Sequence, residues 1–246
     1  MNKPSKVTDL DWKLLTEKYK NKKLEKVVKL IEKDYPIQYL IGNVDFYGYE
    51  IFVKKGVLIP RFETEGLLEE TIKLLKDENM DDISVLDIGT GTGCIPVVLK
   101  KELPNLEITS IDVNRKAIKL AKLNASNYNV KINFIKKNVF HYKPINKYSL
   151  IISNPPYVSK DEPVGPEIKY EPKNAIFADH EGLKYYEYII KNAKKWTTDK
   201  NILAFEIGCG QGKYLKQYAK VYYPKSKVII KKDLSQRDRY LFIINK

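Results

Sequence analysis

Residues 83–93, ISVLDIGTGTG, decide the fold, because an apolar run there ends in an acid and then in a glycine at every second position. Ile83, Val85, Leu86 and Ile88 are typical of a strand that is buried on both faces of a parallel sheet. The next helix can begin only after the glycines. We therefore expect a ligand site at the carboxyl end of this strand.

Three glycines follow the acid in this stretch. Gly89, Gly91 and Gly93 let the backbone turn tightly and approach a ligand closely, since a side chain at any of them would intrude. A dinucleotide-binding loop has the spacing G-x-G-x-x-G. Here the third glycine comes one residue early and Asp87 precedes the first, so nicotinamide and flavin cofactors are disfavoured. The alternative is an ordinary glycine turn without a ligand.

A second acid follows the glycines at the end of another apolar strand, LEITSID (106–112). Asp112 could accept hydrogen bonds from both ribose hydroxyls of a nucleoside. It could instead cap the next helix, a role that Asn114 would fill equally well. Asp-x-Gly-x-Gly-x-Gly resembles motif I of the class I S-adenosylmethionine-dependent methyltransferases, and the loop and acid together indicate a nucleoside-containing cofactor.

The rest of the chain supports one α/β domain with a small addition. Apolar strands and helical stretches alternate after residue 83, which predicts a doubly wound parallel sheet. Residues 1–35 predict a short N-terminal helical region, 36–59 a β-hairpin linker, and 60–246 a catalytic domain. We expect helices over 94–102, 114–128, 183–196 and 211–221, and strands over 132–135, 148–153, 202–208, 227–231 and 239–244.

The composition favours a globular protein and leaves the partner open. The chain has 246 residues, of which 43% are hydrophobic, enough for a packed core. Its net charge of +13 is typical of proteins with a nucleic-acid or ribosome-associated partner. Lysine, asparagine, isoleucine and tyrosine all have codons rich in A and T, however, so genome bias alone could also raise the lysine content.

Cysteine, histidine and apolar stretches exclude several classes of site. Cys94 and Cys209 form neither a C-x-x-C pair nor a disulfide framework, and His141 and His180 lack metal-ligand spacing. No apolar stretch approaches the roughly 20 residues that span a bilayer, and the N-terminus lacks a signal-type core. We expect a cytoplasmic protein with no structural metal and no membrane partner.

The tetrapeptide Asn154-Pro155-Pro156-Tyr157 selects the chemistry. Its two prolines remove two backbone donors and rigidify the chain after a buried strand. Such a segment suits methylation of a planar nitrogen with two hydrogens: the Asn154 side-chain oxygen and the Pro155 carbonyl accept one N–H each, and Tyr157 stacks on the planar group. The tetrapeptide could also be a tight proline turn, and it does not distinguish a glutamine amide from an adenine amine.

Several motifs together identify a resemblance that covers about residues 35–246. They are PIQYLIG, IPRFETE, GTGTG, SNPPY, YEPKNAIFA, FEIGCGQG and KDLSQRDR. The chain resembles the release factor N5-glutamine methyltransferases, the PrmC/HemK family. The resemblance implies a class I methyltransferase sheet with an antiparallel last strand. It also implies that a methyl group passes from S-adenosylmethionine to the glutamine of the Gly-Gly-Gln loop in class 1 peptide chain release factors.

The resemblance also implies roles for particular residues. Those expected to contact the cofactor are Asp87, Gly89, Thr90, Gly91, Thr92, Gly93, Asp112, Val139 and Asn154. Those expected to hold the glutamine as catalytic residues are Asn154, Pro155, Pro156 and Tyr157. The chain departs from the family at Asn138, where an acid is common before the residues on the adenine side of the cofactor.

Three other functions remain open on the sequence alone. A glutamine in a ribosomal protein would be served by the same site chemistry. An adenine-N6 methyltransferase acting on RNA or DNA would need extra surface to hold the strand and expose its base, and no separate target-recognition domain is evident in 246 residues. A non-catalytic binding protein could retain the fold, although intact glycines, Asp112 and Asn154 disfavour it.

Overall fold

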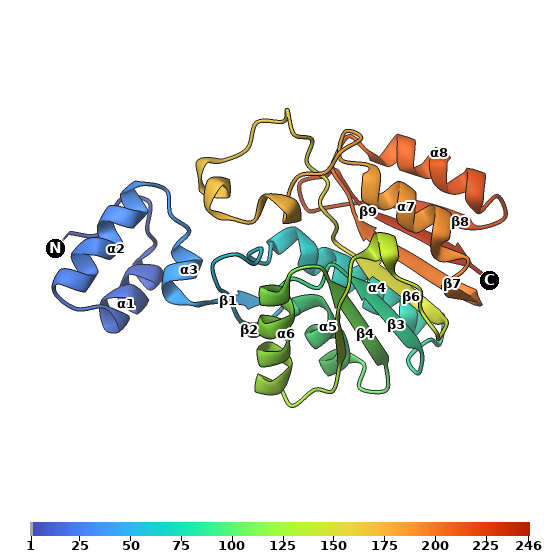
Figure 1. The fold of residues 1–246 in the computed structure, drawn as a ribbon, viewed down its shortest axis with the longest axis horizontal. Coiled ribbons are helices and arrows are strands. Elements are labelled where there is room, and N and C mark those ends of the chain that lie inside the picture. The colour runs from blue at the N-terminus through green and yellow to red at the C-terminus, as the bar shows by residue number, and fades with distance from the viewer. Residues whose placement is uncertain (1) are drawn as a thin grey trace.

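A computed structural model describes residues 2–246 and has a seven-stranded sheet at its centre, in the order β5-β4-β3-β6-β7-β9-β8 (Figure 1). The strands are β3 (Ser84–Ile88), β4 (Glu107–Asp112), β5 (Asn133–Lys136), β6 (Tyr148–Ser153), β7 (Thr197–Glu206), β8 (Lys227–Lys232) and β9 (Asp238–Asn245). β9 runs antiparallel to both of its neighbours, and the other pairs are parallel. The predicted class I methyltransferase sheet with an antiparallel last strand is confirmed.

Helices cover both faces of the sheet because its strands are apolar on both sides. The helices are α4 (Phe62–Asp77), α5 (Cys94–Glu102), α6 (Arg115–Asn127), α7 (Lys184–Ala193) and α8 (Gly212–Tyr222). Val85 of β3 belongs to the core with α4 and α5, whereas Leu86 and Ile88 belong to the core with α7 and α8. Alternate residues of one strand therefore face opposite layers, as the apolar run predicted.

Two element boundaries differ from the sequence-based expectations by more than two residues. The helix expected over 183–196 ends at Ala193, and the strand expected from residue 202 begins at Thr197. Residues 197–201, TTDKN, are polar, so hydrophobic periodicity does not detect the first half of β7. Within residues 2–246, no helix is both long enough and apolar enough to cross a membrane.

The N-terminal segment has a small core of its own. Its elements are α1 (Asp9–Lys18), α2 (Lys22–Glu32), α3 (Ile37–Ile41) and the antiparallel hairpin of β1 (Asn43–Phe46) and β2 (Tyr49–Phe52). Leu15, Val27, Ile31 and Leu40 are buried together, and the three helices lie at one end of the molecule (Figure 1). The linker thus contains a short helix before its hairpin. The domain boundaries themselves stay a prediction.

A buried asparagine fastens the hairpin to the catalytic domain. Asn124 of α6 is fully buried, and its side-chain oxygen accepts a hydrogen bond from the Phe52 N–H at 2.9 Å. Its amide nitrogen donates to the carbonyls of Phe52 at 3.0 Å and Thr92 at 2.8 Å. The hairpin, α6 and the turn after β3 are therefore held by one side chain, whose polar groups are all paired.

The long segment between β6 and α7 is ordered by contacts with distant parts of the chain. It contains two short 3₁₀ helices, η2 (Pro166–Tyr170) and η3 (Lys173–Ala175), and runs between the N-terminal helices and α7 (Figure 1). The buried carboxylate of Glu171 accepts the Ile59 N–H at 3.0 Å and forms an ion pair with Arg61. This clasp joins the segment to the end of the linker.

A glycine fixes the other end of this segment. Gly182 has a φ of +83°, and a Cβ built on it would lie 2.0 Å from the Tyr157 carbonyl oxygen. The same carbonyl accepts a hydrogen bond from the Gln211 side chain at 3.0 Å. The backbone at Tyr157 can take this position because residue 182 has no side chain.

We predict that Gly182→Ala lowers the thermal unfolding midpoint by about 5 °C, since the left-handed backbone and the close contact together cost a few kcal/mol. Gly210→Ala is the matched control: a Cβ there would meet open space, and its φ is not positive. Differential scanning calorimetry of both variants checks this. Equal midpoints would show that the contact is relieved without cost.

Candidate active site

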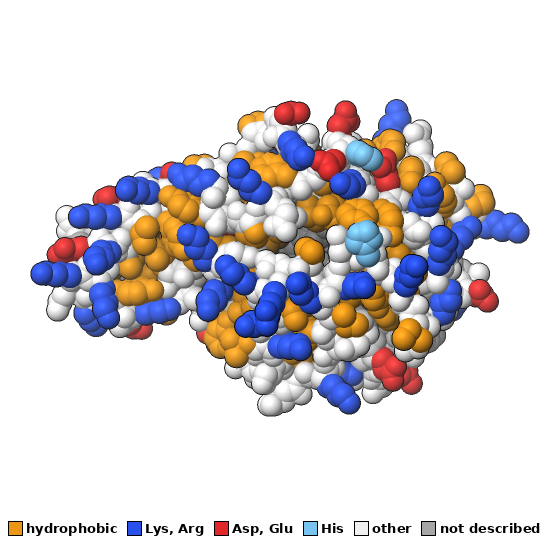
Figure 2. Space-filling view, in the orientation of Figure 1, with side chains coloured by type: hydrophobic (Ala, Val, Ile, Leu, Met, Phe, Trp, Pro, Cys, Tyr) orange, Lys and Arg blue, Asp and Glu red, His pale blue; other side chains and the backbone are white. Residues whose placement is uncertain are grey.

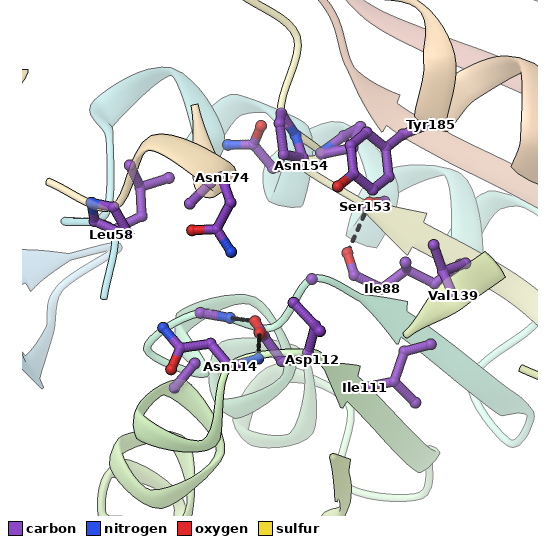
Figure 3. Close-up of a pocket in the computed structure, with 18 of the residues that line it drawn as sticks. Leu58, Ile88, Ile111, Asp112, Asn114, Val139, Ser153, Asn154, Asn174 and Tyr185 are labelled. Carbon is purple, nitrogen blue, oxygen red and sulfur yellow. Dashed lines mark hydrogen bonds between the residues drawn. The ribbon is translucent and has the colours of Figure 1, made fainter. Parts of the chain in front are cut away.

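A pocket lies at the carboxyl ends of β3, β4 and β6, as the sequence predicted for a parallel sheet. Asp112 and Asn114 form one side, and Asn154 and Tyr185 lie on the opposite side (Figure 3). Asn174 closes a third side, from the segment between β6 and α7. The walls combine apolar side chains with a few polar groups, which is typical of a small-molecule site.

The carboxylate of Asp112 is held by backbone donors within this pocket. Its Oδ2 accepts the Gly91 N–H at 2.9 Å and its Oδ1 accepts the Asn114 N–H at 2.7 Å (Figure 3). Burial raises the pKa of Asp112, and these two backbone hydrogen bonds offset part of the rise. Each oxygen keeps a lone pair that could accept a ligand hydroxyl.

The helix-cap role that was the alternative for Asp112 is filled by Asn114. Asn114 is the N-cap of α6, and its side-chain oxygen accepts the Lys116 N–H at 2.9 Å. Its amide nitrogen donates to the Gly56 carbonyl at 2.7 Å, which adds a tie to the linker. Asp112 is therefore left to face the pocket.

The three glycines of the turn after β3 have different surroundings. All have positive φ, but only Gly89 and Gly91 line the pocket. A Cβ on Gly93 would lie 2.9 Å from the Cβ of Ala121, so a side chain there would push α5 and α6 apart. Gly93 therefore allows α5 and α6 to pack closely, and its backbone does not line the pocket.

Behind the turn lies a buried acid without partners. Asp87 is fully buried, and neither of its oxygens has a hydrogen-bond partner of ordinary geometry in residues 2–246. Burial raises the pKa of Asp87 to about 7, and the neighbouring hydroxyls of Thr90 and Ser110 offset only part of this rise. Thr90 and Thr92 are also buried with unpaired hydroxyls.

Asp87, Thr90, Thr92 and Gly93 thus lie outside the lining of the pocket, and their contact with a cofactor stays a prediction. Unpaired polar groups in a protein interior cost free energy. A polar or cationic part of a ligand that reached behind the turn would satisfy them.

The predicted catalytic tetrapeptide begins beside this turn. Asn154, Pro155 and Pro156 line the pocket, and a Cβ on Gly89 would lie 4.0 Å from the Asn154 carbonyl oxygen. The Ser153 hydroxyl donates to the Ile88 carbonyl at 2.7 Å and so locks β6 to β3 (Figure 3). In residues 2–246, the Pro155 carbonyl and the Asn154 side-chain oxygen accept no hydrogen bond.

The last residue of the tetrapeptide is held from the interior of the protein, and its expected contact with the substrate stays a prediction. The Tyr157 hydroxyl donates to Glu206 at 3.2 Å, and Tyr157 is not among the pocket-lining residues. Burial raises the pKa of this hydroxyl. The aromatic ring at the pocket wall is that of Tyr185, from α7 (Figure 3).

Two other residues of the expected rim meet at the pocket. Val139 lines it from η1 (Val139–His141), and Asn138 caps that turn by accepting the Phe140 N–H at 3.0 Å. An amide at position 138 therefore has a local structural role, in addition to lining the pocket. Contact of Val139 with a cofactor stays a prediction.

Sequence reasoning missed several pocket residues, namely Leu58, Lys137, Asn174 and Tyr185. Asn174 lies within YEPKNAIFA, a motif that had been noted without a role. No sequence pattern singled out Tyr185, because an aromatic residue near the start of a helix is common. No group of three or more histidine, cysteine or acidic side chains in the described chain could hold a metal ion.

The sequence of the chain is similar to those of known proteins. Residues 67–169 match the family model described as the Methyltransferase small domain. A release factor glutamine methyltransferase of Fusobacterium nucleatum is 43% identical over 204 residues, which are 81% of this chain and 57% of that protein. The protein of the same name from Enterococcus faecalis is 39% identical, over 84% of this chain and 74% of its own length.

Solved structures give the same result for the fold. The protein-(glutamine-N5) methyltransferase of Alicyclobacillus acidocaldarius, described as release factor-specific, is 23% identical with a TM-score of 0.50. The match covers 76% of this chain and 94% of that one. The chain spans little more than half of the Fusobacterium protein but about three quarters of the Enterococcus protein. With this identity over most of its length, the chain belongs to the release factor glutamine methyltransferase family.

Proposed function

We propose that the protein transfers a methyl group from S-adenosylmethionine to the side-chain amide nitrogen of a glutamine, the one in the Gly-Gly-Gln motif of class 1 peptide chain release factors. The observation that carries the proposal is a pair of free acceptors beside the glycine turn. These are the Asn154 side-chain oxygen and the Pro155 carbonyl. The reaction would take place in the cytoplasm, where release factors act.

The residues around the turn fit the cofactor. Gly89 and Gly91 leave room for close approach, and Asp112 has lone pairs available for ribose hydroxyls. Val113 and Val139 provide apolar surface for a flat ring. When bound, S-adenosylmethionine would supply an electrophilic methyl group on its sulfonium.

The tetrapeptide would bind the acceptor nitrogen. Asn154 and Pro155 each accept one N–H of the glutamine amide, so the nitrogen is oriented with its lone-pair face toward the turn. The same two hydrogen bonds strengthen as positive charge develops on the nitrogen, which lowers the barrier without a strongly basic side chain. Tyr185, rather than Tyr157, is the pocket-lining ring available to pack on the amide.

The names of the relatives support the choice of protein substrate. The Fusobacterium and Enterococcus proteins are both named as release factor glutamine methyltransferases. A glutamine of a ribosomal protein would fit the same two acceptors. The acceptors therefore support the type of reaction, and the choice of release factor as substrate rests on the names of the relatives.

Charge favours a second candidate, an adenine-N6 methyltransferase acting on RNA or DNA. The net charge is +13, and lysine and arginine side chains lie over the N-terminal helices and in a band across the middle of one face (Figure 2). An exocyclic adenine amine has two N–H groups, as a glutamine amide does. The two candidates differ in whether phosphates are contacted, and this difference can be measured.

The cofactor assignment predicts that Asp112→Ala weakens binding of S-adenosylhomocysteine at least about tenfold, because two hydroxyl acceptors are lost. Asp82→Ala is the control, since Asp82 is an exposed carboxylate before the amino end of β3. Isothermal titration calorimetry measures both. An unchanged dissociation constant for Asp112→Ala would refute the assignment.

The amide clamp predicts that Asn154→Ala lowers kcat by about 10²–10³-fold while binding of S-adenosylhomocysteine changes little, since one preorganised contact to the reacting group is lost. The assay follows radiolabelled methyl transfer to purified release factor, with ribosomal proteins, tRNA and DNA offered in parallel. Near-normal turnover by the variant would exclude the clamp.

Salt dependence separates protein from nucleic-acid substrates. A protein loop that inserts an uncharged glutamine should lose little activity between low and physiological salt. Recognition of several phosphates would release counterions and weaken steeply over the same range. We expect robust methylation of release factor with a shallow slope. Methylation of RNA with a steep slope, and none of release factor, would overturn the glutamine assignment.

A further inference from the structure

A buried chain of hydrogen bonds runs from the Asn154 side chain into the protein interior. The Asn154 amide nitrogen donates to the Thr64 hydroxyl at 2.9 Å. That hydroxyl donates to the Glu206 carboxylate at 2.6 Å, and the Tyr157 hydroxyl donates to the other carboxylate oxygen at 3.2 Å. Thr64 and Glu206 are 3% and 1% exposed, so water cannot easily replace these partners.

In these hydrogen bonds the donors and acceptors follow one order: Asn154 donates to Thr64, and Thr64 donates to Glu206. The Thr64 hydroxyl has a single proton, which it donates to Glu206. The hydroxyl can then only accept from Asn154, which must therefore present its NH₂ group. The side-chain oxygen of Asn154 is thereby turned away from Thr64, and it is this oxygen that has no partner in residues 2–246.

We propose that Thr64 and Glu206 are positioning residues that fix the Asn154 amide in the one orientation that offers an acceptor to the substrate nitrogen. The inference rests on the proposed function and deepens it, because it explains why the substrate group must be a donor. If the Asn154 amide rotated by half a turn, its NH₂ would face the NH₂ of the glutamine, and no hydrogen bond could form.

The surroundings of Glu206 support a role beyond packing. Burial raises the pKa of Glu206, and the Thr64 hydrogen bond, the charge of Arg239 and the Tyr157 hydroxyl each lower it. Arg239 is itself held by Asp233 at 3.1 Å and by the Ile207 carbonyl at 3.2 Å. A carboxylate buried on the last residue of β7 costs free energy that an apolar side chain would not. Its donors all come from Thr64 and the catalytic tetrapeptide.

The test is to remove the Thr64 hydroxyl while keeping the shape of the side chain. Thr64→Val and the smaller Thr64→Ala should each lower kcat for release factor methylation about 10–10²-fold, with KM for S-adenosylmethionine little changed. Thr64→Ser should restore most of the activity. Thr71→Val is the matched control: Thr71 is a buried threonine of the same helix, and its hydroxyl donates to the Leu67 carbonyl at 2.7 Å.

A double-mutant cycle distinguishes positioning from stability. If Thr64 acts through Asn154, then adding Thr64→Val to Asn154→Ala should cause no further loss of kcat. The inference would be wrong if the double variant lost kcat by the product of the two single losses, or if the single Thr64 variants turned over as fast as the parent. Either result would leave the proposed function unaffected. A parent enzyme that methylates no glutamine would overturn the proposed function and this inference with it.

Discussion

The pairing of β3 between β4 and β6 is the constraint on which the site depends. In the register of the sheet, Ile88 is paired with Ile111 on one side and with Ser153 on the other. Gly89, Asp112 and Asn154 are therefore the residues that follow this row on the three strands. Because all three strands are parallel, these residues come together at one edge. A slip of one residue in either pairing would turn the polar side chains to another face.

Motifs outside this central fold form the surroundings of the tetrapeptide at residues 154–157. IPRFETE supplies Arg61 and Thr64, YEPKNAIFA supplies Glu171 and Asn174, FEIGCGQG supplies Glu206 and Gln211, and KDLSQRDR supplies Asp233 and Arg239. In the sequence these motifs had no individual chemical role. In the structure each donates, accepts or carries a charge within one connected region. IPRFETE and FEIGCGQG contact residues 154–157 directly, through Thr64, Glu206 and Gln211. YEPKNAIFA and KDLSQRDR hold these two motifs in turn, through the Glu171–Arg61 ion pair and the hydrogen bond from Arg239 to the Ile207 carbonyl.

Features that depend on local pattern could be predicted from the sequence. The apolar strands, the glycine turn and Asp112 at the edge follow from periodicity and spacing, and the sheet with its antiparallel last strand is as expected. The polar start of β7 lacks an apolar pattern, and α3, IQYLI, has only five residues, too few to show a helical period; both were missed. Asp87 and Asp112 both come at the end of an apolar run, yet Asp87 is buried behind the turn and Asp112 lines the pocket.

Contacts between distant segments could not be predicted. The direction of the Tyr157 side chain and the place of Tyr185 depend on how α7 and β7 pack, and no local signal encodes it. The same holds for the Asn154 amide, whose partner Thr64 is 90 residues away. Single-sequence reasoning identifies which residues are chemically suitable, but long-range packing decides how they are turned.

The position of β9 has a consequence for the order in which the enzyme is made. β9 lies between β7 and β8, and within residues 2–246 β8 has no other neighbour in the sheet. The bond from Gly91 to Asp112 spans only 21 residues, whereas Tyr240 of β9 reaches back 177 residues to the Glu63 carbonyl. As the chain leaves the ribosome, the glycine turn can form early, whereas the surroundings of Glu206 are complete only once β9 pairs with β7. A prematurely ended chain would thus be left with β7 as an unpaired edge strand and with Glu206 lacking its neighbours from β9.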